Sequence, residues 1–157
     1  MKLRYLLLLC ALPAHAAAAC MFTSNMTPFQ GDTSALVDNA RIPAPEIASA
    51  SIVRGAGGGA TCDALGFLSV QIKWPRGSDY DLEQIGFEYR VVSGEVPEGL
   101  FPGGVLVSPS SGRKAEHQFT WQDLPPGQQR PLSLVLEVRA VTPDRQRGAP
   151  AQIVVTQ

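Results

Sequence analysis

Residues 68–91, LSVQIKWPRGSDYDLEQIGFEYRV, contain two alternating apolar runs joined by a polar segment that opens with Trp74-Pro75. The apolar residues of each run share one parity: Leu68, Val70, Ile72 and Trp74 in the first, and Ile85, Phe87, Tyr89 and Val91 in the second. Because successive side chains of a strand point to opposite faces, each run buries one face and exposes the other. The stretch predicts two β-strands that fold back on each other.

The first nineteen residues have the pattern of an export signal. Lys2 and Arg4 precede an apolar run that Pro13 interrupts, and small residues follow. The run is shorter than the roughly 20 apolar residues of a membrane-spanning helix, and no other segment is long enough. We therefore expect residues 1–19 to be removed and the mature protein to be periplasmic or extracellular, with no transmembrane segment.

Removal of this signal leaves 138 residues, with 11 basic residues against 14 acidic ones. This length is typical of one domain. The charges are spread along the chain without blocks, so no nucleic-acid-binding surface is predicted.

The cysteines allow two interpretations. Cys10 lies in the signal, so the exported protein keeps Cys20 and Cys62. An even pair outside the reducing cytosol predicts a disulfide, which would close a 43-residue loop and stabilise the fold by about 3 to 4 kcal/mol. Alternatively, Ala17-Ala18-Ala19-Cys20 resembles the lipobox of bacterial lipoproteins, which implies a lipid anchor at Cys20, although Ala17 replaces the usual large aliphatic residue.

Strand signals recur over the rest of the chain. Residues 20–43 show no lasting period, so we expect an irregular leader, followed by one domain over residues 44–157. Apart from the two central runs, strands are expected at 47–53, 105–107, 117–121, 132–140 and 152–156, the first at an edge and 132–140 at the centre of a sheet. Seven short strands separated by turns predict an all-β protein, a two-sheet antiparallel β-sandwich of immunoglobulin-like type.

Several of these motifs resemble fibronectin type III domains. Leu68 to Pro75 and Phe87 to Val91 resemble the B and C strands of that family, which makes Trp74 the core tryptophan. The segments that resemble its E–F corner and its F and G strands are Leu124 to Gly127, Leu136 to Val141 and Gly148 to Pro150. The corner tyrosine is missing, because no tyrosine follows Tyr89, so its hydrogen bond must be replaced or lost.

No pattern predicts a catalytic residue, a cofactor or a metal site, and we expect no enzyme. His117 is the one histidine outside the signal and is expected to be structural or at the surface. Asp79, Asp81 and Glu83 alternate in one loop without the ligand spacing of an EF-hand, which indicates a solvated acidic turn. The segment 54–61 is rich in glycine but lacks the P-loop lysine, so it reads as a flexible linker.

These observations predict a non-catalytic exported module that presents loops or a sheet face to a protein or glycan partner in the cell envelope or outside it. In a sandwich the B–C and F–G connections lie at one end. The candidate partner-binding residues there are Arg76, Asp79, Tyr80, Asp81, Asp144, Arg145 and Arg147. The alternative is a periplasmic protein that binds a glycan or small molecule through exposed aromatic residues, namely Phe67, Tyr80, Phe101 or Trp121.

Overall fold

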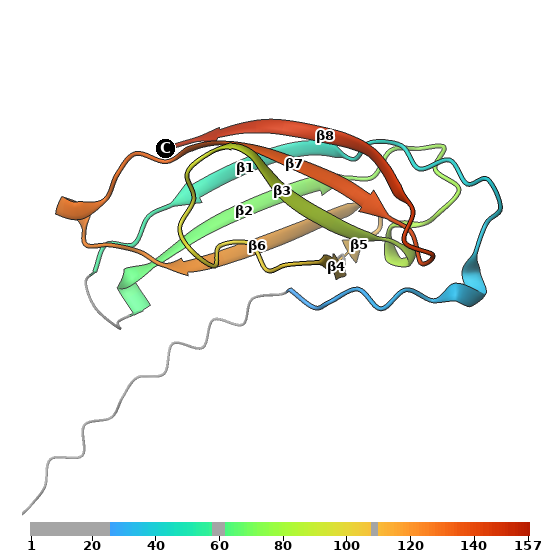
Figure 1. Ribbon diagram of the computed structural model, residues 1–157, viewed down its shortest axis with the longest axis horizontal. Helices are drawn as coiled ribbons and strands as arrows, with labels where there is room; N and C mark the ends of the chain where they lie inside the picture. The colour runs from blue at the N-terminus through green and yellow to red at the C-terminus, as the bar shows by residue number, and fades with distance from the viewer. Residues whose placement is uncertain (1–25, 58–61, 108–109) are drawn as a thin grey trace, which may run out of the picture.

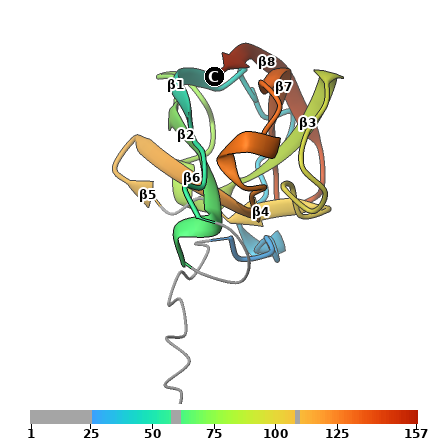
Figure 2. The same cartoon turned by 90° about the vertical axis from the view of Figure 1, so that its left-hand side faces the viewer.

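The computed structural model describes residues 26–57, 62–107 and 110–157, which form two antiparallel β-sheets packed face to face (Figures 1 and 2). One sheet has the order β1-β2-β6-β5, and the other has the order β4-β3-β7-β8. Apart from the two-residue β5, the described chain has seven strands, three in the first sheet and four in the second. The predicted all-β sandwich is therefore confirmed.

The strand bounds follow the predicted segments. The first sheet holds β1 (Glu46–Val53), β2 (Leu65–Lys73), β5 (Ser110–Ser111) and β6 (Lys114–Gln122). The second holds β3 (Gly86–Gly94), β4 (Val105–Val107), β7 (Ser133–Val141) and β8 (Arg147–Thr156). Short 3₁₀ turns lie at Thr33–Ala35 (η1), Cys62–Ala64 (η2), Leu82–Gln84 (η3) and Pro126–Gln128 (η4).

The two central runs fold back across the sandwich and do not pair as a hairpin. β2 hydrogen-bonds to β1 and β6, whereas β3 hydrogen-bonds to β4 and β7. Each run has one apolar face that must be buried. Because the two runs lie in facing sheets, the apolar face of each is buried against the other sheet. The predicted parity holds, since Leu68, Val70, Ile72 and Trp74 are at most 1% exposed.

Trp74 lies at the centre of this core. Its ring meets Phe87 of the other sheet edge to face, with 6.2 Å between ring centroids. Its indole Nε1 donates to the carbonyl oxygen of Tyr80 at 2.9 Å, so the buried polar atom is satisfied. The predicted core residues Phe87, Leu134, Leu136 and Val138 are buried as well, and Tyr89 is half-buried.

Other strand positions were predicted with varying accuracy. β1 is an edge strand, β4 matches residues 105–107, and β7 lies between β3 and β8, all as expected. The last strand begins at Arg147 and not near Gln152, because Arg147 already pairs with Val141. The turn predicted over residues 142–148 is correspondingly shorter.

Residues 26–43 of the predicted leader are described, and they pack closely on the sandwich. Val107 N donates to Thr27 O at 2.7 Å and Phe29 N donates to Val105 O at 2.8 Å, so this segment lies along β4. The Phe29 ring is buried with Val105 and Val141. The leader thereby covers the outer edge of β4 and then continues around one end of the molecule (Figure 1).

Candidate functional site

The leader contacts both loops that the sequence singled out, at the right-hand end of Figure 1. On one side Val37 N donates to the Tyr80 hydroxyl at 2.9 Å, and Arg41 N donates to Asp79 Oδ2 at 2.6 Å. On the other side the leader reaches Arg145, whose Nη2 donates to Phe29 O at 3.3 Å. Three segments that are distant in sequence therefore form one surface, which we call the loop end: residues 31–42, 76–83 and 142–146.

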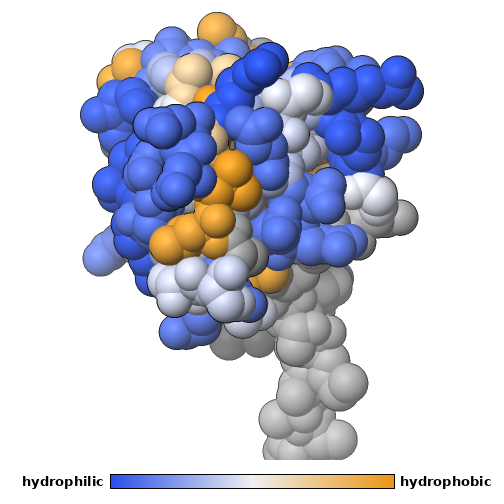
Figure 3. All heavy atoms as spheres, turned by 90° about the vertical axis from the view of Figure 1, so that its right-hand side faces the viewer, coloured by the Kyte–Doolittle hydropathy of each residue, from blue (hydrophilic) through white to orange (hydrophobic). Residues whose placement is uncertain are grey.

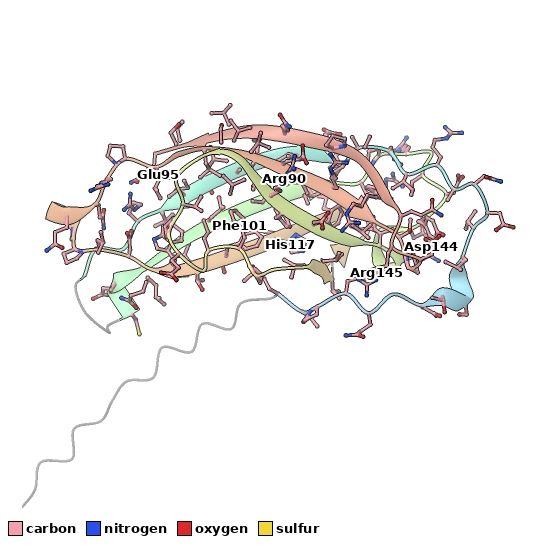
Figure 4. All side chains as sticks on the ribbon, viewed as in Figure 1. Arg90, Glu95, Phe101, His117, Asp144 and Arg145 are labelled. Atoms are coloured by element: carbon pink, nitrogen blue, oxygen red, sulfur yellow. The ribbon has the colours of Figure 1, made fainter. Side chains whose placement is uncertain are left out.

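The loop over residues 142–146 is held by its own polar groups. The Thr142 hydroxyl donates to Asp144, and the Gln146 side chain donates to the other carboxylate oxygen at 2.6 Å. The hydrogen bond from Thr142, followed by that from Gln146, outweighs burial and lowers the pKa of Asp144. The backbone of Arg145 takes the left-handed conformation, with φ of 69°, within this turn. Figure 4 labels Asp144 and Arg145 side by side in this loop.

The structure separates the predicted partner-binding residues into three groups. Arg76, Asp79, Asp81, Asp144 and Arg145 are exposed on the loop end. Tyr80 is only 3% exposed and belongs to the core, so its ring is not part of the exposed surface that the sequence predicted. Arg147 is exposed on β8, and its guanidinium is paired with Glu88 of β3 at 2.7 and 2.9 Å.

The loop end also exposes two large apolar side chains that sequence reasoning missed. Leu36 is 47% exposed and Val37 is 41% exposed, although the backbone N–H of Val37 is fixed on Tyr80. Figure 3 shows a hydrophobic patch on this end, with hydrophilic atoms on both sides of it. In the sequence these two residues carry no signal, because they belong to a leader without strand or helix periodicity.

The opposite end of the sandwich is fixed by a buried ion pair. Arg54 Nε and Nη2 donate to Asp123 at 2.7 and 2.9 Å, and the two side chains are only 9% and 3% exposed. Burial alone would raise the pKa of Asp123, but hydrogen bonds from Arg54, Gly55 N and Leu124 N bring it down to about 2. Arg54 and Gly55 were expected to begin a flexible linker, and this network anchors them instead.

The same network holds the β6–β7 connection, the segment whose sequence resembles a corner without its tyrosine. The Gln129 side-chain amide donates to Gly55 O at 2.6 Å and to Leu124 O at 2.7 Å. These bonds, with those of Asp123, tie the β6–β7 connection to the end of β1.

His117 is a structural residue. It is fully buried on β6, where Nε2 lies 2.9 Å from Val107 O and Nδ1 lies 2.7 Å from the Tyr89 hydroxyl. A carbonyl oxygen can only accept, so Nε2 carries the proton and Nδ1 accepts from Tyr89. Desolvation lowers the pKa of His117, which keeps the imidazole neutral.

The acidic loop residues are engaged in the fold. Asp79 accepts from Arg41 N, and Asp81 forms a capping box with Gln84 at the start of η3. Within the described ranges, no group of three or more His, Cys, Asp or Glu side chains could hold a metal ion. In the same ranges no helix has the length and apolar character needed to span a membrane.

The aromatic residues named for glycan binding form no exposed patch. Tyr80 and Trp121 are buried, and Phe67 and Phe101 are half-buried. The Phe101 ring stacks parallel to Tyr89 and meets Phe119 edge to face, with ring centroids 6.1 and 4.8 Å apart. Phe101 therefore closes the side of the sandwich.

The disulfide cannot be read from the described residues. Cys62 begins η2, whereas Cys20 lies outside the part of the chain that the structure describes. The pairing of Cys20 with Cys62 and the lipid anchor at Cys20 stay predictions, as does the signal over residues 1–19.

Comparison of the chain with protein-family models, with curated proteins and with solved structures found no match.

Proposed function

We propose that this protein is a non-catalytic, exported binding module, and that its loop end contacts a partner protein of the cell envelope or its surroundings. The observation that carries the proposal is that the Leu36 and Val37 side chains are exposed while the backbone that bears them is held in place. Hydrogen bonds from Val37 N to Tyr80 and from Arg41 N to Asp79 fix the leader over the end of the sandwich. An apolar centre with a charged rim, held by a rigid scaffold, is the usual anatomy of a protein-binding surface.

The fold supports this assignment through its likeness to fibronectin type III and immunoglobulin-like domains. If β2, β3, β7 and β8 are read as strands B, C, F and G, then B lies in one sheet, and C, F and G lie together in the other. This is the distribution found in immunoglobulin-type sandwiches. Such folds carry function on loops at their ends, which agrees with a site at the loop end.

Capture of the partner from an envelope extract tests the proposal. The double variant Leu36→Ser/Val37→Ser removes the apolar centre, and we expect it to weaken capture at least tenfold, roughly the effect of losing one central anchor. The matched control is Val53→Ser/Leu124→Ser, which removes two residues that are 60% and 52% exposed elsewhere on the surface. Equal capture by both double variants would refute the loop end as the binding surface.

A further inference from the structure

A groove next to the loop end carries an excess of positive charge. It has a volume of about 400 Å³ and lies where β1 and β6 begin and where β2 ends. It is lined by Glu46, Lys73, Trp74, Pro75, Arg76, Arg113 and Lys114. Four of these side chains are cationic and one is anionic. We call it the basic groove; it is unexpected in a chain whose net charge is −1.

The register of the sheet makes this excess costly. Lys73 of β2 is paired directly with Lys114 of β6. Like charges in directly opposed cross-strand positions destabilise a sheet. Glu46 relieves only one of them, since its Oε2 lies 3.2 Å from Lys73 Nζ. A local arrangement that opposes stability without a structural gain is a mark of a functional site.

Another groove of about the same volume shows what charge compensation looks like in this protein. It is lined by β3, β7, the start of β8 and residues 101–104, and it holds Arg90, Arg139 and Arg147. Each of these arginines has a carboxylate partner, at 3.2 and 3.0 Å on Glu137 and at 2.7 Å on Glu88. In contrast, within the described residues neither Arg76 nor Lys114 has an ion-pair partner.

Arg113 gives the basic groove a fixed wall. Its Nη2 donates to Trp74 O at 2.6 Å, and its own carbonyl accepts from Trp74 N at 2.8 Å. Trp74 is buried in the core, so these bonds hold the turn before β6 against the end of β2. Lys73, Arg76 and Lys114 are then presented from a rigid base.

We infer that the basic groove binds an acidic, carboxylate-bearing segment of a partner protein. Glu46 already places a carboxylate in the groove against Lys73. The cations are contributed by the end of β2, by Arg76 in the loop that follows it and by the start of β6, so a segment with several carboxylates can meet more of them than one compact anion can. Trp74 is buried and Pro75 is half-buried, so the lining offers no exposed large apolar side chain that could enter a lipid bilayer.

This inference rests on the proposed binding function, because it names the chemistry of the partner next to the loop end. It can fail separately. A purified peptide tests the groove without the natural partner, whereas capture through Leu36 and Val37 tests the loop end without the peptide.

The test measures fluorescence anisotropy of a labelled hexaglutamate peptide with the full-length mature protein, beside a hexaglutamine peptide. We expect binding of hexaglutamate alone, weakened at high ionic strength because salt screens exposed charges. Arg76→Gln/Lys114→Gln should weaken it about tenfold or more. The control Arg90→Gln/Arg130→Gln removes the same charge elsewhere and should change affinity by less than about twofold.

A single further variant separates binding from stability. Lys114→Glu puts an opposite charge across from Lys73, so we expect the melting temperature to rise by about 1 to 3 °C while hexaglutamate binding is lost. Equal weakening by both double variants would overturn the inference. So would groove-dependent binding of inorganic phosphate or of phosphatidylglycerol vesicles by a protein that does not bind hexaglutamate.

Discussion

At the scale of single residues, the buried polar groups of this protein serve the fold. His117 and Tyr89 satisfy each other between the sheets, and Arg54 and Asp123 do so at one end. The inventory of histidines predicted that His117 is structural or at the surface, and its complete burial shows that it is structural. The partners of Arg54 could not be anticipated, because Asp123 lies 69 positions away and only the tertiary fold brings them together.

Asp123 should make the stability depend on acid pH. Its pKa is about 2 in the folded protein, below the ordinary value of 3.8, so its contribution is present above about pH 4 and is lost as the pH falls towards 2. The full contribution is about 2 kcal/mol. Urea unfolding over this range should show the free-energy difference between wild type and Asp123→Asn shrinking with acidification.

Asp63→Asn is the control, because Asp63 is exposed and its side chain lies outside the Arg54 network. At neutral pH it should cost much less free energy of unfolding than Asp123→Asn. A difference between wild type and Asp123→Asn that does not change between about pH 4 and pH 2 would contradict the assigned role of the ion pair.

At the scale of elements, alternation identified the strands but not their partners. The parity of residues 68–74 and 85–91 predicted which side chains are buried, because a strand between core and solvent has a period of two. Which strands pair depends on contacts between distant segments. The juxtaposition of Lys73 and Lys114 follows from the β2–β6 register, so the basic groove had no signal in the sequence.

Trp74 tests this packing of strands, since it directly follows β2 and meets Phe87 of β3. Trp74→Ala should reduce the free energy of unfolding by about 3 to 5 kcal/mol, because it leaves a cavity between the sheets and removes a satisfied indole. Thermal unfolding followed by circular dichroism measures the loss. A melting temperature within a degree or two of wild type would mean that the two sheets do not pack through this residue.

At the scale of the whole molecule, residues 26–43 of the leader pack on the sandwich. Sequence reasoning placed the start of the domain at residue 44, because residues 20–43 have no period. Phe29 nevertheless joins the core beside Val105 and Val141, and the segment that follows it builds part of the loop end. An isolated aromatic residue in an irregular segment gives no sequence signal of its burial, since burial here depends on an edge strand that lies about 75 residues further along.

Phe29→Ala tests whether the leader is part of the folded unit. Loss of this buried ring should cost about 3 kcal/mol, and the substitution leaves Cys20 unchanged, so a Cys20–Cys62 disulfide would not be altered. The leader should also loosen from β4, which hydrogen exchange can detect at Val107, whose N–H is bonded to Thr27 O.

Leu36→Ser/Val37→Ser changes only exposed side chains of the same leader and should leave both measurements near wild type. Unchanged stability and unchanged exchange in Phe29→Ala would show that residues 44–157 fold without the leader, and the loop end would then lose the rigidity on which its proposed binding role depends.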